Sequence, residues 1–295
     1  MAPHAAEKPL VSFLGLGNMG TPMARRVATA FPLTVWNRTG ARADDLSAVA
    51  RVATTPADAA RGANILVTCV ADAIALEEIL GGAQGVLSAI EPGAVLLEMS
   101  TIGRAAAREA ARAVESRGGY FVDAPVSGSV GPATRGELLA LVGGADRDVE
   151  RVTPVLQTMC DRVLRAGGVG QGQALKVVLN GVGAHHFVAF ASMLALGERA
   201  GLSREVVVQA FTSGAFASPS YVSKKDKVLA RDYGSVEFTL ALALKDGALN
   251  LALQQEVGLT LPVQREIARE VAQAVAEGLG DEDLFAMEKY FNPRK

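Results

Sequence analysis

Short apolar segments alternate with helical segments through the first half of the chain. The apolar segments are continuous rather than alternating with polar residues, which is typical of parallel strands buried on both faces. They predict strands at residues 10–14, 33–36, 65–70, 95–99, 120–123 and 138–142, and helices at 19–29, 41–48, 56–60, 73–80 and 104–117. This pattern predicts an α/β fold with a Rossmann-type, doubly wound and mostly parallel sheet.

The second half of the chain has a different pattern. Strand-like segments end at the glycine-rich stretch 167–172, and helices are expected at 173–199, 204–212, 220–230, 240–256 and 262–278. The first of these helices is so largely apolar that we expect it to be surrounded by protein. The pattern therefore predicts a Rossmann domain at residues 1–168 and an all-helical domain at residues 169–295.

A glycine-rich turn follows the first predicted strand and directly precedes the first predicted helix. Gly15 permits a tight turn, Gly17 lets the backbone approach a pyrophosphate, and Gly20 lets the helix pack closely on the strand. The N–H groups at the start of the helix attract the anion. The alternative is a simple strand-to-helix turn, but this context favours a dinucleotide site formed by Gly15, Leu16, Gly17, Asn18, Met19 and Gly20.

The end of the second predicted strand bears on the choice of dinucleotide. NAD-binding domains usually place an acidic residue there to bind the ribose 2′-hydroxyl, whereas this chain has Asn37, Arg38 and Thr39. The Arg38 guanidinium can bind a 2′-phosphate, with Asn37 and Thr39 donating hydrogen bonds. We therefore expect NADP(H), the alternative being that Arg38 is a solvated loop arginine.

Composition narrows the classes of function. A chain of 295 residues that is 49% hydrophobic can form two packed domains, and a net charge of −2 gives no broad positive surface for nucleic acid. Cys69 and Cys160 have no metal-binding spacing, and we interpret them as reduced core thiols. We expect no uncharged stretch near the ~20 residues that span a bilayer, no signal peptide, and therefore a cytoplasmic protein without a membrane partner.

Four segments make nearly the whole chain resemble the β-hydroxyacid dehydrogenase family, which includes 3-hydroxyisobutyrate dehydrogenase, tartronate semialdehyde reductase and the glyoxylate/succinic semialdehyde reductases. The segments are Phe13-Leu-Gly-Leu-Gly-Asn-Met-Gly20, Asp123-Ala-Pro-Val-Ser-Gly-Ser129, Gly170-Gln-Gly-Gln-Ala-Leu-Lys176-Val-Val-Leu-Asn180 and Lys245-Asp246. The usual second segment ends Ser-Gly-Gly, so Ser129 is a departure from the family pattern.

The resemblance implies a role for each segment. The loop with Ser127, Gly128 and Ser129 would bind the substrate carboxylate, at a carboxyl edge of the sheet where open α/β folds bind ligands. Lys176 would be the catalytic acid and base, and Asn180 would position the substrate. The resemblance also places Val70, Ser100, Thr101 and Lys245 beside the cofactor, with Asp246 as a neighbour of Lys245.

Lys176 is also unusual from its sequence context alone. It is the only charged residue between Arg165 and Glu198, on a helix apolar enough to be buried. Burial lowers the pKa of a lysine toward neutrality, which suits a general acid, and Asn180 lies one turn later on the same helix face. The alternative is a surface lysine whose stem covers apolar residues. Neighbouring His185 and His186 point about 100° apart on a helix, so we expect core or domain-interface histidines and no metal site.

These features predict hydride transfer between NADP(H) and a small carboxylate-bearing aldehyde, keto acid or hydroxyacid. An imine reductase on the same fold is the enzymatic alternative, although such enzymes usually lack the lysine and the Asp-Ala-Pro-Val-Ser-Gly loop. 6-Phosphogluconate dehydrogenase is disfavoured because its C-terminal region is much longer. A non-catalytic NADP-binding scaffold is the alternative outside enzymes. The resemblance further implies a homodimer or homotetramer.

Overall fold

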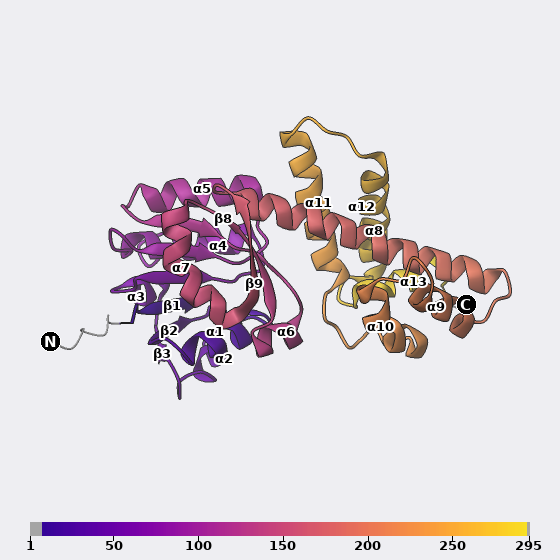
Figure 1. The fold of residues 1–295 in the computed structure, drawn as a ribbon, viewed down its shortest axis with the longest axis horizontal. Helices are drawn as coiled ribbons and strands as arrows, with labels where there is room; N and C mark the ends of the chain where they lie inside the picture. Colours follow the sequence, from indigo (N-terminus) through magenta and orange to yellow (C-terminus); the bar gives the residue numbers. More distant parts are fainter. Residues whose placement is uncertain (1–7, 294–295) are drawn as a thin grey trace. The chain divides into compact units, whose positions relative to one another are not determined.

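The computed structural model describes residues 8–293. The described chain divides along its sequence into two compact units, the first ending at Lys176 and the second beginning at Val177 (Figure 1). The end of the strand pattern in the sequence predicts a division after residue 168, and that boundary stays a prediction.

The first unit is built on one sheet, of nine strands among the described residues, with six parallel strands in the order β3-β2-β1-β4-β5-β6. Strand β8 pairs antiparallel with β6 and β7 and parallel with β9. The strands are β1 (Val11–Leu14), β2 (Leu33–Trp36), β3 (Arg51–Val52), β4 (Ile65–Thr68), β5 (Val95–Glu98), β6 (Tyr120–Asp123), β7 (Val126–Ser127), β8 (Leu138–Gly143) and β9 (Cys160–Gly167).

Helices cover both faces of this sheet, which explains the continuous apolar strands. Phe13 contributes to a core with α1, α2, α6 and α7, while its neighbour Leu14 contributes to a second core with α3, α4 and α5. The helices are α1 (Gly20–Ala28), α2 (Ala41–Asp44), α3 (Pro56–Ala60), α4 (Ala73–Leu80), η1 (Val86–Ser88), α5 (Arg104–Glu115), α6 (Val130–Arg135) and α7 (Asp146–Met159). The predicted Rossmann-type fold is confirmed.

Several elements of this unit were not predicted from the sequence. Strands β3 and β7 have only two residues each, too short for an apolar segment to mark them. Most side chains of β9 are exposed, and three of them are the charged residues Asp161, Arg162 and Arg165. The strand therefore lacks the continuous apolar segment that marked the buried strands. Helix α7 was missed although it buries one apolar face, because Pro154 lies within it. The short helix α6 was missed as well.

The described part of the second unit is all helical, as predicted. It comprises most of α8 (Gln171–Arg199), followed by α9 (Arg204–Ser213), α10 (Pro219–Ala230), α11 (Leu240–Glu256), α12 (Pro262–Ala274), η2 (Val275–Leu279), η3 (Leu284–Ala286) and α13 (Met287–Phe291). Side chains of Ser203, Ser218 and Thr239 cap the starts of α9, α10 and α11, which fixes where these helices begin. The η3 and α13 segment was not predicted.

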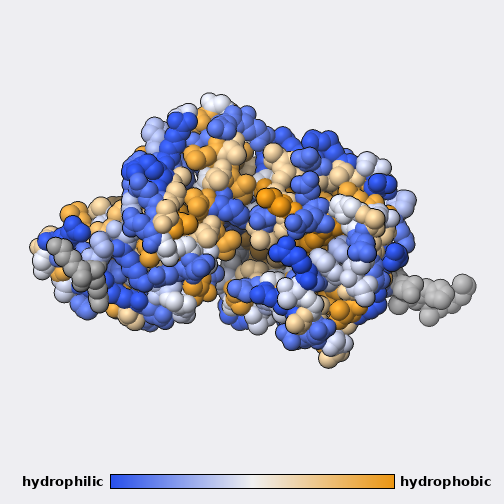
Figure 2. Space-filling model, turned by 180° about the vertical axis from the view of Figure 1, so that it is seen from behind, coloured by the Kyte–Doolittle hydropathy of each residue, from blue (hydrophilic) through white to orange (hydrophobic). Residues whose placement is uncertain are grey.

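Helix α8 corrects two expectations. Residues 177–197 contain no Asp, Glu, Lys or Arg, and α8 is long and apolar enough to cross a membrane by length and composition, so an uncharged stretch of that length does exist. The helix is also not surrounded by its own chain, since only 39% of its most apolar 18-residue stretch is buried. Phe190 and Leu194 pack in the core of the unit, whereas Val182 and Leu196 are 51% and 60% exposed. Apolar side chains on the visible surface are orange in Figure 2.

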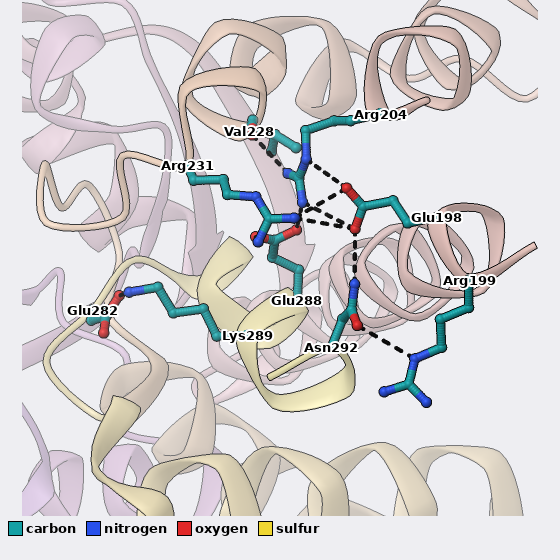
Figure 3. A network of polar contacts seen from close by, with 9 residues as sticks. All are labelled: Glu198, Arg199, Arg204, Val228, Arg231, Glu282, Glu288, Lys289 and Asn292. Atoms are coloured by element: carbon teal, nitrogen blue, oxygen red, sulfur yellow. Dashed lines mark hydrogen bonds and ion pairs between the residues drawn. The ribbon is translucent and has the colours of Figure 1, made fainter. Parts of the chain in front are cut away.

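A network of ion pairs connects the end of α8 with α9 and the C-terminal helix α13 (Figure 3). The Arg204 side chain donates to Glu198 Oε1 over 2.9 Å, to the Val228 carbonyl over 2.8 Å, and also to Glu288. Arg231 donates to Glu198 over 3.1 Å. Arg204 is 9% exposed and Glu288 is 2% exposed, so the buried charges are compensated by each other.

Candidate active site

The glycine turn between β1 and α1 has the shape that a pyrophosphate requires. Gly15 has a φ of 99°, and a Cβ there would lie 2.3 Å from the Cys69 carbonyl oxygen. At Gly17 a Cβ would meet only the Arg42 guanidinium, at 4.0 Å, so the backbone is open to an approaching ligand. The turn therefore fits the phosphates of a dinucleotide at the start of α1. The Leu16 side chain is fully buried, so Leu16 can contribute only its backbone.

The end of β2 holds this turn in place. The Asn37 side chain accepts a hydrogen bond from Leu16 N over 2.8 Å and donates one to the Thr39 carbonyl over 2.9 Å. This geometry gives Asn37 a role in ordering the turn. Its predicted hydrogen bond to the cofactor phosphate stays a prediction, since an amide nitrogen has two N–H donors. Thr39 is exposed.

Two arginines lie near the end of β2. The Arg38 side chain is 80% exposed and pairs with the exposed Glu78 over 3.1 Å. Such a surface pair contributes little free energy, about 0–1 kcal/mol, so a phosphate can compete for Arg38. Arg42 donates to the Leu16 carbonyl over 3.3 Å, which brings a second guanidinium to the turn. Arg42 was not among the site residues predicted from the sequence; its spacing of four residues after Arg38, at the start of a helix, was the available signal.

The predicted substrate loop lies at the edge of the sheet. Strand β7 ends at Ser127, and Gly128 has a φ of 138° with the Leu138 side chain 2.6 Å from where a Cβ would be. Only glycine fits there without strain. Ser129 precedes α6 with a φ of −106°, a conformation open to any residue, and its side chain makes no capping hydrogen bond. The departure from Ser-Gly-Gly therefore costs no backbone strain.

Lys176 and Asn180 lie on α8, on either side of the boundary between the two units. Lys176 is half-buried rather than fully buried. Within the second unit, Asn180 Nδ2 donates a hydrogen bond to Asp246 Oδ2 over 2.6 Å. Lys245 Nζ forms an ion pair with Asp246 Oδ1 over 3.4 Å. Asp246 thus fixes the Asn180 amide so that its Oδ1 remains an acceptor.

Two buried carboxyl groups end the strands next to the substrate loop. Glu98 accepts hydrogen bonds from Thr68 Oγ1 and from Ser100 N, the latter over 2.5 Å. Its burial, with a smaller repulsion from Asp123, raises the pKa of Glu98 to about 7. Burial also raises the pKa of Asp123 to about 6, although backbone N–H groups of Gly170 and Gln173 oppose the rise. Neither Glu98 nor Gln173 was among the site residues predicted from the sequence; an ionisable residue at the end of an apolar strand was the available signal for Glu98.

The remaining candidates differ in how they are placed. Ser100 is buried, and its hydroxyl accepts from Val70 N over 2.8 Å, so these two cofactor candidates are adjacent. Thr101 is half-buried, and Val70 lies two residues beyond the end of β4 rather than ending it.

His186 is exposed and His185 is half-buried, with His185 Nδ1 donating to the Gly181 carbonyl over 2.8 Å, so neither is a core histidine. Within residues 8–293, no group of His, Cys, Asp and Glu is arranged to hold a metal ion.

Two family models cover almost the whole chain. Residues 10–168 match the NAD binding domain of 6-phosphogluconate dehydrogenase, and residues 170–291 match the NAD-binding domain of NADP-dependent 3-hydroxyisobutyrate dehydrogenase. The fold and the phosphate turn therefore define a nicotinamide-dinucleotide oxidoreductase.

Individual relatives agree with these models. The chain is 31% identical to glyoxylate/succinic semialdehyde reductase 1 of Arabidopsis thaliana, over 94% of this chain and 96% of the relative. Among solved structures, 3-hydroxyisobutyrate dehydrogenase from Salmonella typhimurium matches with a TM-score of 0.87 at 27% identity, over 96% of this chain and 99% of that chain. Psf3 in complex with NADP+ and 2-OPP matches with a TM-score of 0.85 at 25% identity, over 96% and 100% of the two chains.

The chain belongs to the β-hydroxyacid dehydrogenase family. It is an NAD(P)-binding oxidoreductase of the group that contains 3-hydroxyisobutyrate dehydrogenase and the glyoxylate reductases, whose substrates are small hydroxyacids and semialdehydes.

Proposed function

We propose that the protein is an NADP(H)-dependent reductase of small aldehydes or keto acids that carry a carboxylate, acting with Lys176 as general acid and base. The observation that carries this proposal is the position of Lys176 in the first turns of α8. The start of that helix is bonded to Asp123, the residue from which the loop to Ser127 and Gly128 departs.

Each residue has a distinct task in this mechanism. The Ser127 hydroxyl and the backbone N–H groups beside Gly128 hold the substrate carboxylate and thereby aim its carbonyl. When bound, NADPH supplies a hydride to the carbonyl carbon. The Lys176 ammonium gives a proton to the carbonyl oxygen, which becomes a hydroxyl, and the neutral amine takes that proton back in the oxidation direction. The Asn180 oxygen accepts a hydrogen bond from the ammonium or from the substrate hydroxyl.

The preference for NADP(H) over NAD(H) is supported by the end of β2. The segment Asn37-Arg38-Thr39 contains no acidic residue of the kind that binds the ribose 2′-hydroxyl of NAD, and Arg38 and Arg42 supply two guanidinium groups near the turn. Arg38→Ala should raise the KM for NADPH at least about tenfold, since charge-assisted bonds contribute 1.5–3 kcal/mol, and should leave the KM for NADH unchanged. Arg61→Ala, which removes another exposed arginine from a surface ion pair, is the matched control. Equal NADPH binding by Arg38→Ala would exclude this assignment.

The role of Lys176 can be tested by following NADPH absorbance with a panel of substrates. The panel contains glyoxylate, succinic semialdehyde, tartronate semialdehyde, methylmalonate semialdehyde and one cyclic imine. Lys176→Ala should lower kcat by about 10²–10⁴-fold with the best substrate while NADPH binding is retained. Lys225→Ala, at an exposed lysine of α10, should keep wild-type turnover. Turnover near wild type in Lys176→Ala would refute the mechanism.

The same panel separates the alternative functions. Faster reduction of the cyclic imine than of every semialdehyde would identify an imine reductase. Tight NADPH binding with no turnover on the panel would instead support a non-catalytic NADP-binding scaffold. Both results would overturn the proposed activity.

We also propose that the protein is a homodimer or homotetramer associating through its helical unit. The support is the apolar surface that this unit leaves exposed, including Val178, Val182, Met193 and Leu196 of α8 and Phe216, which is 93% exposed. Val178 and Val182, like Met193 and Leu196, are spaced by about one helical turn, so each pair shares a face of α8. Monomeric proteins rarely expose large apolar patches. A monomeric mass by light scattering at micromolar concentration would contradict this proposal.

A further inference from the structure

Gln173 lies in the first turn of α8, and its side chain is completely buried. The amide oxygen accepts hydrogen bonds from Ile102 N over 3.0 Å and from Gly103 N over 3.1 Å. The amide nitrogen donates to the Ser100 carbonyl over 2.7 Å. One side chain thus binds both donors and an acceptor of the segment that follows β5.

Asp123 binds the same helical turn from the next strand. Its two carboxylate oxygens accept from Gly170 N over 2.7 Å and from Gln173 N over 2.8 Å. The helix approaches the sheet so closely that a Cβ at Gly172 would lie 2.2 Å from the Leu141 carbonyl oxygen and 2.8 Å from Asp123 Oδ2. The start of α8 therefore cannot rotate or slide without breaking these bonds.

The hydrogen bonds continue away from the helix across the ends of two more strands. Ser100 N donates to Glu98 Oε1, and the Ser100 hydroxyl accepts from Val70 N. Thr68 at the end of β4 donates to the other oxygen of Glu98. One buried chain of hydrogen bonds, which we call the strand-end chain, thus joins Thr68, Glu98, Ser100, Gln173 and Asp123.

We propose that Gln173 is a positioning residue for the reaction: through its bonds to the segment 100–103 and its contact with Asp123, it fixes the helical turn that carries Lys176. This inference rests on the proposed role of Lys176. Lys176 follows Gln173 by three residues, which is about 4.5 Å along the axis and less than one turn around it. Displacement of the first turn is therefore transmitted directly to the lysine. A misplacement of about 1 Å in a reacting group can cost about 10²-fold in rate.

The amide of Gln173 is needed because it both accepts and donates. A leucine would fill the space without bonding Ile102 N, Gly103 N or the Ser100 carbonyl. An ionised glutamate could accept from the two N–H groups but would set a negative oxygen against the Ser100 carbonyl. A protonated glutamate regains a donor and restores all three bonds. Burial, and the Asp123 and Glu98 carboxyls of the strand-end chain, should raise the pKa of a glutamate at position 173. Such a glutamate therefore becomes protonated as the pH falls.

The experiment compares kcat, KM and NADPH Kd of the full-length wild type, Gln173→Leu, Gln173→Glu and a control. The control is Ser12→Ala, which removes another fully buried hydrogen bond of the first unit, from Ser12 Oγ to the Ala59 carbonyl. Gln173→Leu should lower kcat by about 10–100-fold and change NADPH Kd much less. The kcat of Gln173→Glu relative to wild type should rise at least about threefold as the pH falls from about 8 to about 6, because protonation restores the donor.

Two results would overturn the proposal. One is a kcat of Gln173→Leu equal to that of Ser12→Ala. The other, which is decisive if Gln173→Leu fails to fold, is a ratio of Gln173→Glu to wild-type kcat that does not change with pH. Lys176→Ala distinguishes the two levels of inference. If it is active, the proposed function fails; if it is inactive while Gln173→Leu turns over normally, only the positioning role fails.

Discussion

Replacement of Glu98 by glutamine should change how the stability of the first unit depends on pH. Glu98 is fully buried at the end of β5, and burial raises its pKa from the usual 4.5 to about 7. The folded state therefore holds a proton that the unfolded state releases above about pH 4.5. The resulting stabilisation is fully present below that pH and is lost as the pH rises through about 7.

The expected magnitude follows from the size of the pKa shift. The difference between 4.5 and about 7 is about 2.5 pKa units. At 1.36 kcal/mol per unit, it corresponds to about 3 kcal/mol between the two ends of the pH range. Glu98→Gln keeps the shape of the side chain and does not titrate. The free energy of unfolding of the wild type, relative to that of this variant, should thus fall by about 3 kcal/mol between about pH 4.5 and about pH 8.

Urea unfolding followed by tryptophan fluorescence measures this difference. Trp36, at the end of β2, is the only tryptophan in the sequence, so its emission reports on the first unit. Glu109→Gln, at an exposed glutamate of α5, controls for general effects of charge. If the difference between wild type and Glu98→Gln stays constant within about 0.5 kcal/mol over this range, Glu98 is ionised in the folded protein and the reasoning is wrong.

Three further predictions concern other parts of the molecule. Gly15→Ala should weaken NADPH binding at least about tenfold in calorimetric titration, because its Cβ would lie 2.3 Å from the Cys69 carbonyl oxygen; an unchanged Kd would contradict the assigned turn. Arg204→Met leaves the buried Glu288 carboxylate with one fewer partner and should cost about 3 kcal/mol of stability by far-UV circular dichroism during urea unfolding; a loss below about 0.5 kcal/mol would mean the network contributes little. Burial raises the pKa of Cys69 and of Cys160 to about 12, so neither thiol should react rapidly with a disulfide reagent at about pH 8 until the protein unfolds; a thiol reacting at the rate of free cysteine would disprove this.

The class of fold and the place of the dinucleotide turn could both be predicted from the amino-acid sequence. Both depend on local patterns: strands buried on both faces, such as β1 and β4, need continuous apolar segments, and the turn needs glycine at positions 15 and 20. Helix α11 was likewise predicted with the bounds it has, 240–256. Elements without a local apolar signal, such as the exposed strand β9, could not be predicted in this way.

The partners of the buried polar groups, by contrast, follow from the three-dimensional fold. Glu98, Asp123 and Gln173 are separated by 25 and 50 residues along the chain, and only the parallel order of β5 and β6 brings their side chains to the start of α8. The sequence likewise gave no sign that the Asn37 amide bonds Leu16 and Thr39 and so orders the glycine turn. The physical reason is that hydrophobic periodicity is a property of neighbouring residues, while the partner of a buried hydrogen-bonding group is chosen by strand order and helix packing.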